Sequence, residues 1–535
     1  MNQNSLTGAA ATPHSGATAA AHRAFAEGGN AVDAALAAAA MLTVVYPNQC
    51  TIGGDAIAMV GTPDGNVTVV NGSGRSARIT DRNKYIGPDG FVPVAGALSV
   101  TVPGVLSAWE VLADKWGRQP LAAALLPAAA VAKAGVTVAP GVARDLIREQ
   151  HLLSQDAGCR EVFFQDGVVL KQGETLKLVR LAETLTRLAE DGVNAFYRGP
   201  IGDSVLETLR SLGSELTRKD LEDHQATLER PASVEFAGTE YLSAAGNSQG
   251  TFFLQGLAAL DVVADELGRI PDPDGEDAGV IAGILAAAAR DRDQYLGDPS
   301  HREVPVDVLL SRETAAATAQ RALTRSLSGS NAGRTYARRT GDTVAVVTAD
   351  SEGNWVSLIQ SAFHAFGSCV LDPGTGILLH NRAASFSLTP GAANELRPST
   401  RPPHTLMPVL VRKDGKLVGA HGTMGGRAQP QVHTHLALNL ALGMAPDAAS
   451  ARARWIIGQM EAGAAAADDA ATIAIESGVS NRAVQALHAA GFRSKELEAF
   501  DDAAGHLQVV RLIEDAASIA VGSDPRSDGL LADGT

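Results

Sequence analysis

Thr343 begins a hydrophobic run, TVAVVTADSEGNWVSLIQS, that directly follows the polar stretch TRSLSGSNAGRTYARRTGD. A threonine hydroxyl is a poor nucleophile at neutral pH, and the α-amino group released by cutting the chain before the threonine can act as its base. Gly341 and Asp342 favour a bend that would expose the bond to be cut. The junction between residues 324–342 and Thr343 is therefore typical of a self-cleaving N-terminal nucleophile, and an ordinary loop leading into a strand is the simpler alternative.

A second possible nucleophile lies in residues 246–250, whose sequence GNSQG matches the G-x-S-x-G pattern of serine hydrolases. The pattern falls between a predicted strand and a predicted helix, as that type of site requires. It also needs an acid and a histidine, for which the sequence offers Asp372, Asp414, His421 and His433. An α/β hydrolase that uses Ser248 is thus the main rival hypothesis, beside a plain glycine-rich loop.

Two other patterns favour no cofactor. The segment GSGRSA at residues 72–77 resembles a dinucleotide-binding turn, but the RITDRNKYIGPDG that follows lacks the apolar stripe of a helix. His433 and His435 would share a face only in a strand, and their surroundings read as a helix. We therefore expect neither a cofactor nor a metal.

The segment GTMGG at residues 422–426 follows a predicted strand. Tandem glycines leave backbone N–H groups unshielded by side chains, which suits an oxyanion hole that binds developing negative charge. An ordinary tight turn is the alternative interpretation.

Length, charge and cysteine content limit the classes of function. A chain of 535 residues can form two or three units or one large interleaved domain. The net charge of -15, with no Lys/Arg cluster, argues against a nucleic-acid partner and favours a small-molecule substrate. No basic and apolar leader is visible, the most apolar run is too short and Ala-rich to span a membrane, and three scattered cysteines suit a reducing compartment. A cytoplasmic location without a membrane partner is the expectation.

Hydrophobic periodicity predicts helices and strands in both halves of the chain. Helices are expected from residue 31 into the forties and at 105–116, 119–131, within 177–230, from 251, at 278–297, from 433 and near 480–491, and strands at 55–60, 66–71, 240–244, 343–349, 355–361, 376–381 and 406–420. This order predicts an α/β layered architecture in which residues 324–342 separate two parts of one fold.

Taken together, these segments resemble the γ-glutamyltransferase (γ-glutamyltranspeptidase) family of N-terminal nucleophile hydrolases. The resemblance rests on GGNAVDAALAAAAMLTVVYPNQCTIGGDAIAMV, VTVPGVLSAWEVLADKWGRQPL and ARDRDQYLGDP, and then on DTVAVVTADSEGNWVSLIQ, FGSCVLDPGTGILLHNRAASFSL, RPPHTLMPVLV and GTMGGRAQPQ. It implies a four-layer αββα fold and a proenzyme that cuts itself between Asp342 and Thr343. Residues 1–342 would form a large subunit and residues 343–535 a small one, which stay associated.

The resemblance also implies roles for individual residues. Thr343 would be the nucleophile and, through its new amine, the base. Gly425 and Gly426 match the family's oxyanion-hole glycines. Ser361 falls where the family's T-x-N motif has its supporting Thr, and Phe363 falls where that motif has Asn.

The substrate pocket departs from the family pattern. The family's Gln falls on Arg382, its Asp on Ser385 and its Ser-Ser pair on His404-Thr405, while its carboxylate-binding Arg lies near Arg75. Replacing the Asp removes an anion whose pairing with a substrate ammonium is worth on the order of 2–4 kcal/mol when desolvated. Arg382 adds a fork suited to a carboxylate. The expected reaction is cleavage of a γ-glutamyl or related carboxylated amide, with a non-glutamyl amide, as in oxamate amidohydrolase or cephalosporin acylase, as the alternative.

Overall fold

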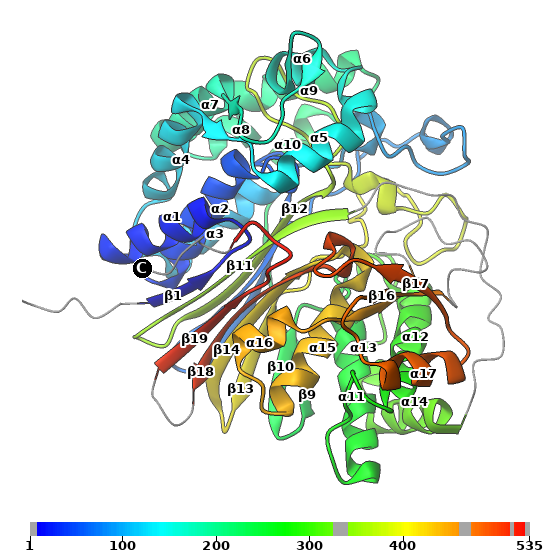
Figure 1. The fold of residues 1–535 in the computed structure, drawn as a ribbon. Helices are drawn as coiled ribbons and strands as arrows, with labels where there is room; N and C mark the ends of the chain where they lie inside the picture. Colours follow the sequence, from blue (N-terminus) through cyan, green and yellow to red (C-terminus); the bar gives the residue numbers. More distant parts are fainter. Residues whose placement is uncertain (1–7, 325–340, 459–471, 514–517, 530–535) are drawn as a thin grey trace, which may run out of the picture.

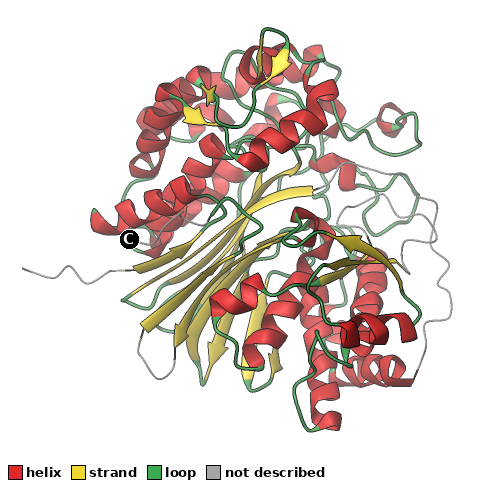
Figure 2. Cartoon of the chain, in the orientation of Figure 1, coloured by secondary structure: helices red, strands yellow, loops and turns green. Residues whose placement is uncertain are grey.

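The computed structural model describes residues 8–324, 341–458, 472–513 and 518–529. Its centre is a pair of stacked six-stranded sheets (Figures 1 and 2). The first sheet has the order β1 (Gly8–Ala11), β11 (Gly341–Asp350), β12 (Trp355–His364), β2 (Asp55–Gly61), β3 (Val67–Asn71) and β8 (Thr227–Glu229). The second has the order β19 (Ser518–Ser523), β18 (His506–Ile513), β14 (Lys416–Met424), β13 (Val409–Lys413), β10 (Thr239–Ser243) and β9 (Ala232–Phe236). Every neighbouring pair in both sheets is antiparallel.

Helices cover the outer face of each sheet, which completes the four-layer αββα arrangement expected from the sequence. On the first sheet lie α1 (Ser15–Ala26), α2 (Ala31–Val45) and α3 (Val105–Trp116), with α4 (Ala122–Ala134), α5 (Pro140–Leu153), α6 (Ala157–Phe163), α7 (Val179–Asp191), α8 (Asn194–Tyr197), α9 (Pro200–Ser211) and α10 (Arg218–Glu222) beyond them (Figure 1). On the second lie α11 (Gly250–Leu267), α12 (Ala278–Tyr295), α13 (Val306–Leu309), α14 (Arg312–Thr324), α15 (Gln429–Ala441), α16 (Pro446–Ala451) and α17 (Asn481–Ala489). A small sheet of β15 (Trp455–Ile457), β16 (Thr472–Glu476) and β17 (Arg493–Leu497) and the short pairs β4 (Val136–Thr137) with β7 (Thr175–Leu176) and β5 (Phe164–Gln165) with β6 (Val168–Val169) complete the fold.

Three apolar clusters hold these layers together. The middle cluster joins the facing sides of the two sheets through residues such as Ile57, Val347, Ile359 and Leu410. One outer cluster packs α1 to α9 against the first sheet, and the other packs α11, α12 and α15 against the second. The Ala-rich helix α2 lies almost entirely buried in the first outer cluster, because its small side chains permit close approach to neighbouring elements.

Strands from before and after Thr343 pair with each other within each sheet. In the first sheet β11 and β12 lie between β1 and β2, and in the second β13 is paired to β10. A cut before Thr343 would therefore leave two chains joined by whole ladders of backbone hydrogen bonds. This interleaving is the physical basis on which large and small subunits could stay associated.

Most of the predicted elements are present, with two differences at the site. Strand β11 begins at Gly341, two residues before Thr343, while residues 325–340 of the predicted linker lie outside the described residues. The predicted strand at 376–381 forms only isolated bridges, Gly53 with Leu379 and Leu371 with Leu378. None of the helices in the described ranges is long and apolar enough to cross a membrane.

Candidate active site

Thr343 and Ser361 meet across the two central strands of the first sheet. The Thr343 hydroxyl donates a hydrogen bond of 3.1 Å to the Ser361 hydroxyl oxygen. The β11–β12 register shifts here, because Asp342 pairs with Phe363 and Val344 with Gln360, which leaves two residues of β12 opposite Thr343 alone. A bulge of this kind re-aims a side chain out of the regular ladder. The predicted nucleophile and its predicted supporting hydroxyl are thus in contact.

The predicted nucleophile, Thr343, is enclosed in the intact chain. Thr343 is 1% exposed and Ser361 is fully buried, and β11 runs without a break from Gly341 through Thr343. An amide substrate cannot reach a hydroxyl that is covered in this way. Opening the chain before Thr343 would both free its amine and uncover its hydroxyl.

Gly425 and Gly426 form a turn directly after β14, close to the start of β11. Gly425 has a φ of 146° and Gly426 a φ of 50°, conformations that side chains disfavour. A short 3-10 turn from Gly426 to Ala428 packs against β11. Gly422 brings the sheets together here, because a Cβ on it would press on Ala345 and Ile359. The predicted oxyanion-hole glycines therefore lie at the nucleophile's strand.

The substrate side of the site is a buried cluster of charged and titratable groups around Asp55. The Asp55 carboxylate lies 3.0 Å from His380 Nδ1, 3.2 Å from His404 Nε2 and 3.4 Å from Arg382 Nε, and all four side chains are fully buried. His380 also contacts the Thr101 carbonyl at 2.9 Å. Asp55 is the cross-strand partner of Ser361 in the β2–β12 register, so the cluster adjoins the nucleophile.

The cluster holds Asp55 ionised and His404 neutral. Burial alone would raise the pKa of Asp55, but His380 and His404 hold the pKa of that carboxyl well below its usual range. Burial, assisted by the nearby charge of Arg382, lowers the pKa of His404 to about 4. Asp55 is thus the counter-charge that makes a fully buried Arg382 tolerable.

The other predicted pocket residues are placed around Arg382. Arg382 donates to the Thr405 hydroxyl at 3.3 Å, and its guanidinium lies 4.1 Å from the centre of the Phe363 ring. Ser385 donates its hydroxyl to the Arg382 carbonyl at 2.7 Å within the same short helix, η3 (Arg382–Ser385). His404 and Thr405 face this cluster from the segment that leads into β13.

Arg75 lies further out, with 39% of its side chain exposed. Its guanidinium binds Asp298 at 2.9 Å and the Ser399 carbonyl at 2.8 Å. The preceding residue, Gly74, donates its N–H to Asp55 at 3.2 Å, which ties this loop to the cluster. Arg401 lies near this loop: burial and the charge of Arg75 lower its pKa.

Sequence reasoning missed three residues of this site. Asp55 and His380 carry the buried cluster, and Gln249 donates its side-chain amide to the carbonyls of Thr405 and Gly426, each at 2.7 Å. Gln249 therefore links the substrate side to the glycine turn. A charged residue at the start of the fully buried run DAIAMVG was the available signal for Asp55.

Ser248 does not form a serine-hydrolase site. Its hydroxyl is fully buried and donates to the Leu406 carbonyl at 2.7 Å, and it accepts from the N–H of Gly250. Its backbone is bridged to His404, but that imidazole contacts Asp55 instead. Both large sheets are antiparallel, whereas the α/β-hydrolase elbow stands on a mostly parallel sheet. The GNSQG segment is a loop that supports the pocket through Gln249.

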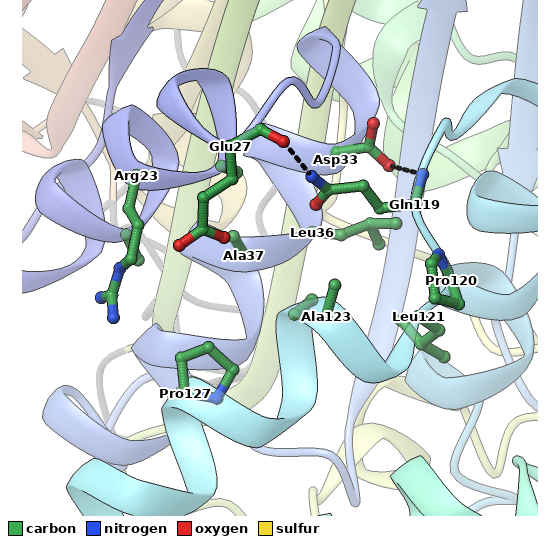
Figure 3. Close-up of a pocket in the computed structure, with 13 residues that line it drawn as sticks. Arg23, Glu27, Asp33, Leu36, Ala37, Gln119, Pro120, Leu121, Ala123 and Pro127 are labelled. Atoms are coloured by element: carbon green, nitrogen blue, oxygen red, sulfur yellow. Dashed lines mark hydrogen bonds between the residues drawn. The ribbon is translucent and has the colours of Figure 1, made fainter.

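A separate small hollow lies among α1, α2 and the start of α4 (Figure 3). Gln119 donates its side-chain amide to the Glu27 carbonyl across it, and the Gln119 N–H binds Asp33. Its free volume of about 20 Å³ suffices for one water molecule and not for an amide substrate. None of the candidate site residues lines this hollow, so it is not part of the candidate active site.

Comparison with known proteins shows one family and one fold for this chain. The model of the Gamma-glutamyltranspeptidase family matches residues 17–533. The chain is 32% identical to a glutathione hydrolase-like proenzyme of Bacillus subtilis over 97% of each chain, and 31% identical to an oxamate amidohydrolase proenzyme of Klebsiella pneumoniae over 99% of this chain and 98% of the relative. Its fold matches a cephalosporin acylase from Bacillus halodurans with a TM-score of 0.87 and 31% identity, covering 100% of this chain and 98% of that one.

These matches extend over nearly the whole chain, and the similar proteins are named as hydrolases and acylases. The chain belongs to the γ-glutamyltranspeptidase family of N-terminal nucleophile amidohydrolases.

Proposed function

We propose that this chain cuts itself between Asp342 and Thr343, and that the released Thr343 then hydrolyses a small carboxylated amide through an acyl-threonine intermediate. The observation that carries the proposal is the buried hydrogen bond from the Thr343 hydroxyl to Ser361 at the β11–β12 bulge. It orients the nucleophile's oxygen in a fully buried place.

In the self-cleavage step, the Thr343 hydroxyl attacks the carbonyl carbon of Asp342. The C–O bond forms as the C–N bond breaks, which gives an ester and a free α-amine on Thr343. Water then hydrolyses the ester and leaves Asp342 with a new carboxylate. Ser361 supports this step by holding the Thr343 oxygen in place.

In the catalytic cycle, the Thr343 amine takes the proton of its own hydroxyl as that oxygen attacks the substrate amide. The amine then gives the proton to the leaving nitrogen, so that the substrate's C–N bond breaks and an acyl ester remains on Thr343. Backbone N–H groups at Gly425 and Gly426 would bind the oxyanion of each tetrahedral intermediate. Water attacks the ester and restores the hydroxyl; an acceptor amine in place of water would give transfer.

The charges around Arg382 favour a substrate with a carboxylate and no α-amino group. Arg75, Arg382 and Arg401 concentrate positive charge near Asp55, whose carboxylate already faces two histidines and Arg382. Ser385, at the position of the family's Asp, uses its hydroxyl on a backbone carbonyl. Of the acids beside these arginines, Asp298 binds Arg75, Asp55 binds Arg382 and Glu229 binds Arg401, so each is already paired and Ser385 adds no anion for a substrate ammonium.

This observation favours an amide of the oxamate type over a γ-glutamyl amide. The similarity to an oxamate amidohydrolase proenzyme and to a cephalosporin acylase supports the same choice. A γ-glutamyl donor such as glutathione is the second candidate, because a relative of equal similarity is named glutathione hydrolase-like.

The test of self-cleavage is denaturing electrophoresis of the purified protein with N-terminal sequencing of the smaller fragment. We expect that fragment to begin at Thr343, and we expect Thr343→Ala to stay a single inactive chain. Ser248→Ala, a matched loss of a buried hydroxyl, should still be cut. An intact wild-type chain with full activity would overturn the proposal.

The test of substrate class is a comparison of kcat/KM for oxamate, glutathione and a γ-glutamyl anilide. Higher kcat/KM for oxamate supports the carboxylated amide without an α-amino group. Higher values for both γ-glutamyl compounds would establish the second candidate instead.

A further inference from the structure

We propose that Phe363 is a positioning residue that couples the nucleophile to the substrate-binding arginine: its backbone fixes Ser361 and its ring fixes Arg382. The proposal rests on the proposed function for its substrate half and on self-cleavage alone for its nucleophile half. Phe363 is 2% exposed and lies opposite Asp342 in the β11–β12 register, beside the bond to be cut.

The backbone of Phe363 has an unusual conformation that serves the nucleophile. Its φ is 79°, in the left-handed region that bulky residues rarely adopt. In this conformation its N–H donates to the Ser361 hydroxyl oxygen at 2.7 Å, and the same oxygen accepts from Thr343. The left-handed turn therefore sets the position of the oxygen that orients the nucleophile.

The ring of Phe363 contacts the side chains of His364 and Arg382. One face stacks on His364, with ring centres 4.2 Å apart and planes 20° apart, and the Arg382 guanidinium lies 4.1 Å from the ring centre. Asn381 fixes His364 by accepting its backbone N–H at 3.0 Å and by contacting its Nδ1 at 2.8 Å. The ring thus rests on a fixed support.

The aromatic character of this ring matters for the substrate. The Arg382 guanidinium contacts Asp55 and Thr405, and its central carbon lies over the Phe363 ring. A cation over an aromatic face in a desolvated site gains a favourable electrostatic contact that an aliphatic side chain cannot supply. Replacing the ring with an aliphatic side chain of similar volume should therefore weaken the binding of a substrate carboxylate by Arg382.

The substrate half is tested by Phe363→Leu against Phe363→Tyr and Phe363→Trp, with oxamate and its uncharged analogue oxamide as probes. We expect Phe363→Leu to be cut completely and to raise KM for oxamate roughly tenfold, with kcat and the constants for oxamide little changed. In Phe363→Tyr and Phe363→Trp, KM for oxamate should stay close to the wild-type value.

The matched control for this half is Phe366→Leu. Phe366 is also buried, has a φ of 56° and contacts the Phe163 ring rather than an arginine. Its substitution should leave the oxamate-to-oxamide ratio unchanged. A change in both substrates alike for Phe363→Leu, or no recovery in Tyr and Trp, would overturn the positioning role of the ring.

The nucleophile half is tested by the rate of precursor conversion in Phe363→Val and Phe363→Gly. Valine resists a positive φ and should slow cleavage roughly tenfold, while glycine accepts it and should cut faster than valine despite losing more volume. Equal rates would refute the backbone role. This readout needs no substrate, so an enzyme that hydrolyses neither probe would refute the proposed substrate class and leave the Phe363 comparison decisive.

Discussion

The nucleophile side and the substrate side of this site are built in different ways. Thr343, Ser361 and the Gly425–Gly426 turn depend on neutral hydroxyls, backbone N–H groups and local chain conformation. The substrate side depends on Asp55, His380, His404 and Arg382, which come from distant parts of the chain and interact through charge in a fully buried place. The first arrangement can be shared by enzymes with different substrates, whereas the second is the one that we propose selects the substrate.

The largest expected effect is on stability and concerns the substrate side. Asp55→Ala removes the counter-charge of a fully buried Arg382 and the hydrogen-bond partner of His380, which should lower the free energy of unfolding by about 3–5 kcal/mol. The measurement is urea denaturation of the purified protein.

The matched control for Asp55 is Glu183→Ala, which removes the acid of an exposed i,i+3 pair with Arg180 on α7. That change should be barely measurable, because water screens exposed pairs. A loss for Asp55→Ala as small as for Glu183→Ala would show that the buried cluster does not hold the substrate side together.

The next effect concerns the nucleophile side. Gly425→Ala should lower kcat by about 10²–10³-fold, because a side chain at a φ of 146° distorts the turn that presents the oxyanion donors. Steady-state kinetics on the cut enzyme measures it.

Gly443→Ala serves as the control, since Gly443 also has a positive φ, 87°, with nothing near its Cβ position and no role in the site. If both variants keep kcat, the Gly425 turn is not an oxyanion hole.

The pH dependence of stability separates the two sides further. The folded state lowers the pKa of His404 from 6.5 to about 4, so the unfolded chain binds a proton first as pH falls. Stability from this neutral histidine is complete above pH 6.5 and is lost between pH 6.5 and about 4, by roughly 3 kcal/mol. Urea denaturation at several pH values in this range should show a smaller loss of unfolding free energy in His404→Gln than in the wild type.

Other buried histidines with lowered pKa values, such as His433 and His435 at about 3, add their own decline in both proteins. The difference between wild type and variant is therefore the quantity to compare. An identical slope in the two proteins would contradict a neutral His404 in the folded state.

The smallest expected effect is at the nucleophile's hydrogen bond. Ser361→Ala should slow precursor conversion roughly tenfold, the value of one hydrogen bond of about 1–1.5 kcal/mol, and Ser361→Thr should keep it. The time course of cleavage on denaturing gels provides the rate.

Ser357→Ala is the control on the same strand, because Ser357 is equally buried but donates to the His421 carbonyl. Similar slowing in Ser357→Ala would mean that packing of β12, and not the contact with Thr343, controls the rate.

The nucleophile side and the substrate side also differ in how far the sequence could predict them. Thr343 and the glycine turn were indicated by their residue types at a predicted strand start and turn, and Ser361 was predicted by the family resemblance. The bulge that makes Thr343 and Ser361 meet was not, because register depends on how two strands pair. The strand predicted at 376–381 is absent for the same reason: its backbone makes only isolated bridges, Leu379 with Gly53 before β2 and Leu378 with Leu371.

The sequence by itself determined the order of helices and strands, because hydrophobic periodicity and turn chemistry are local, and its likeness to one family predicted Thr343 as the nucleophile. Only the tertiary structure decided what surrounds the substrate. Asp55 meets His380 and Arg382 across 325 and more residues of chain, and a carboxylate's partners and charge state depend on such long-range neighbours and on burial. Neither the long-range neighbours nor the burial of a side chain can be predicted from the residues next to it in the sequence.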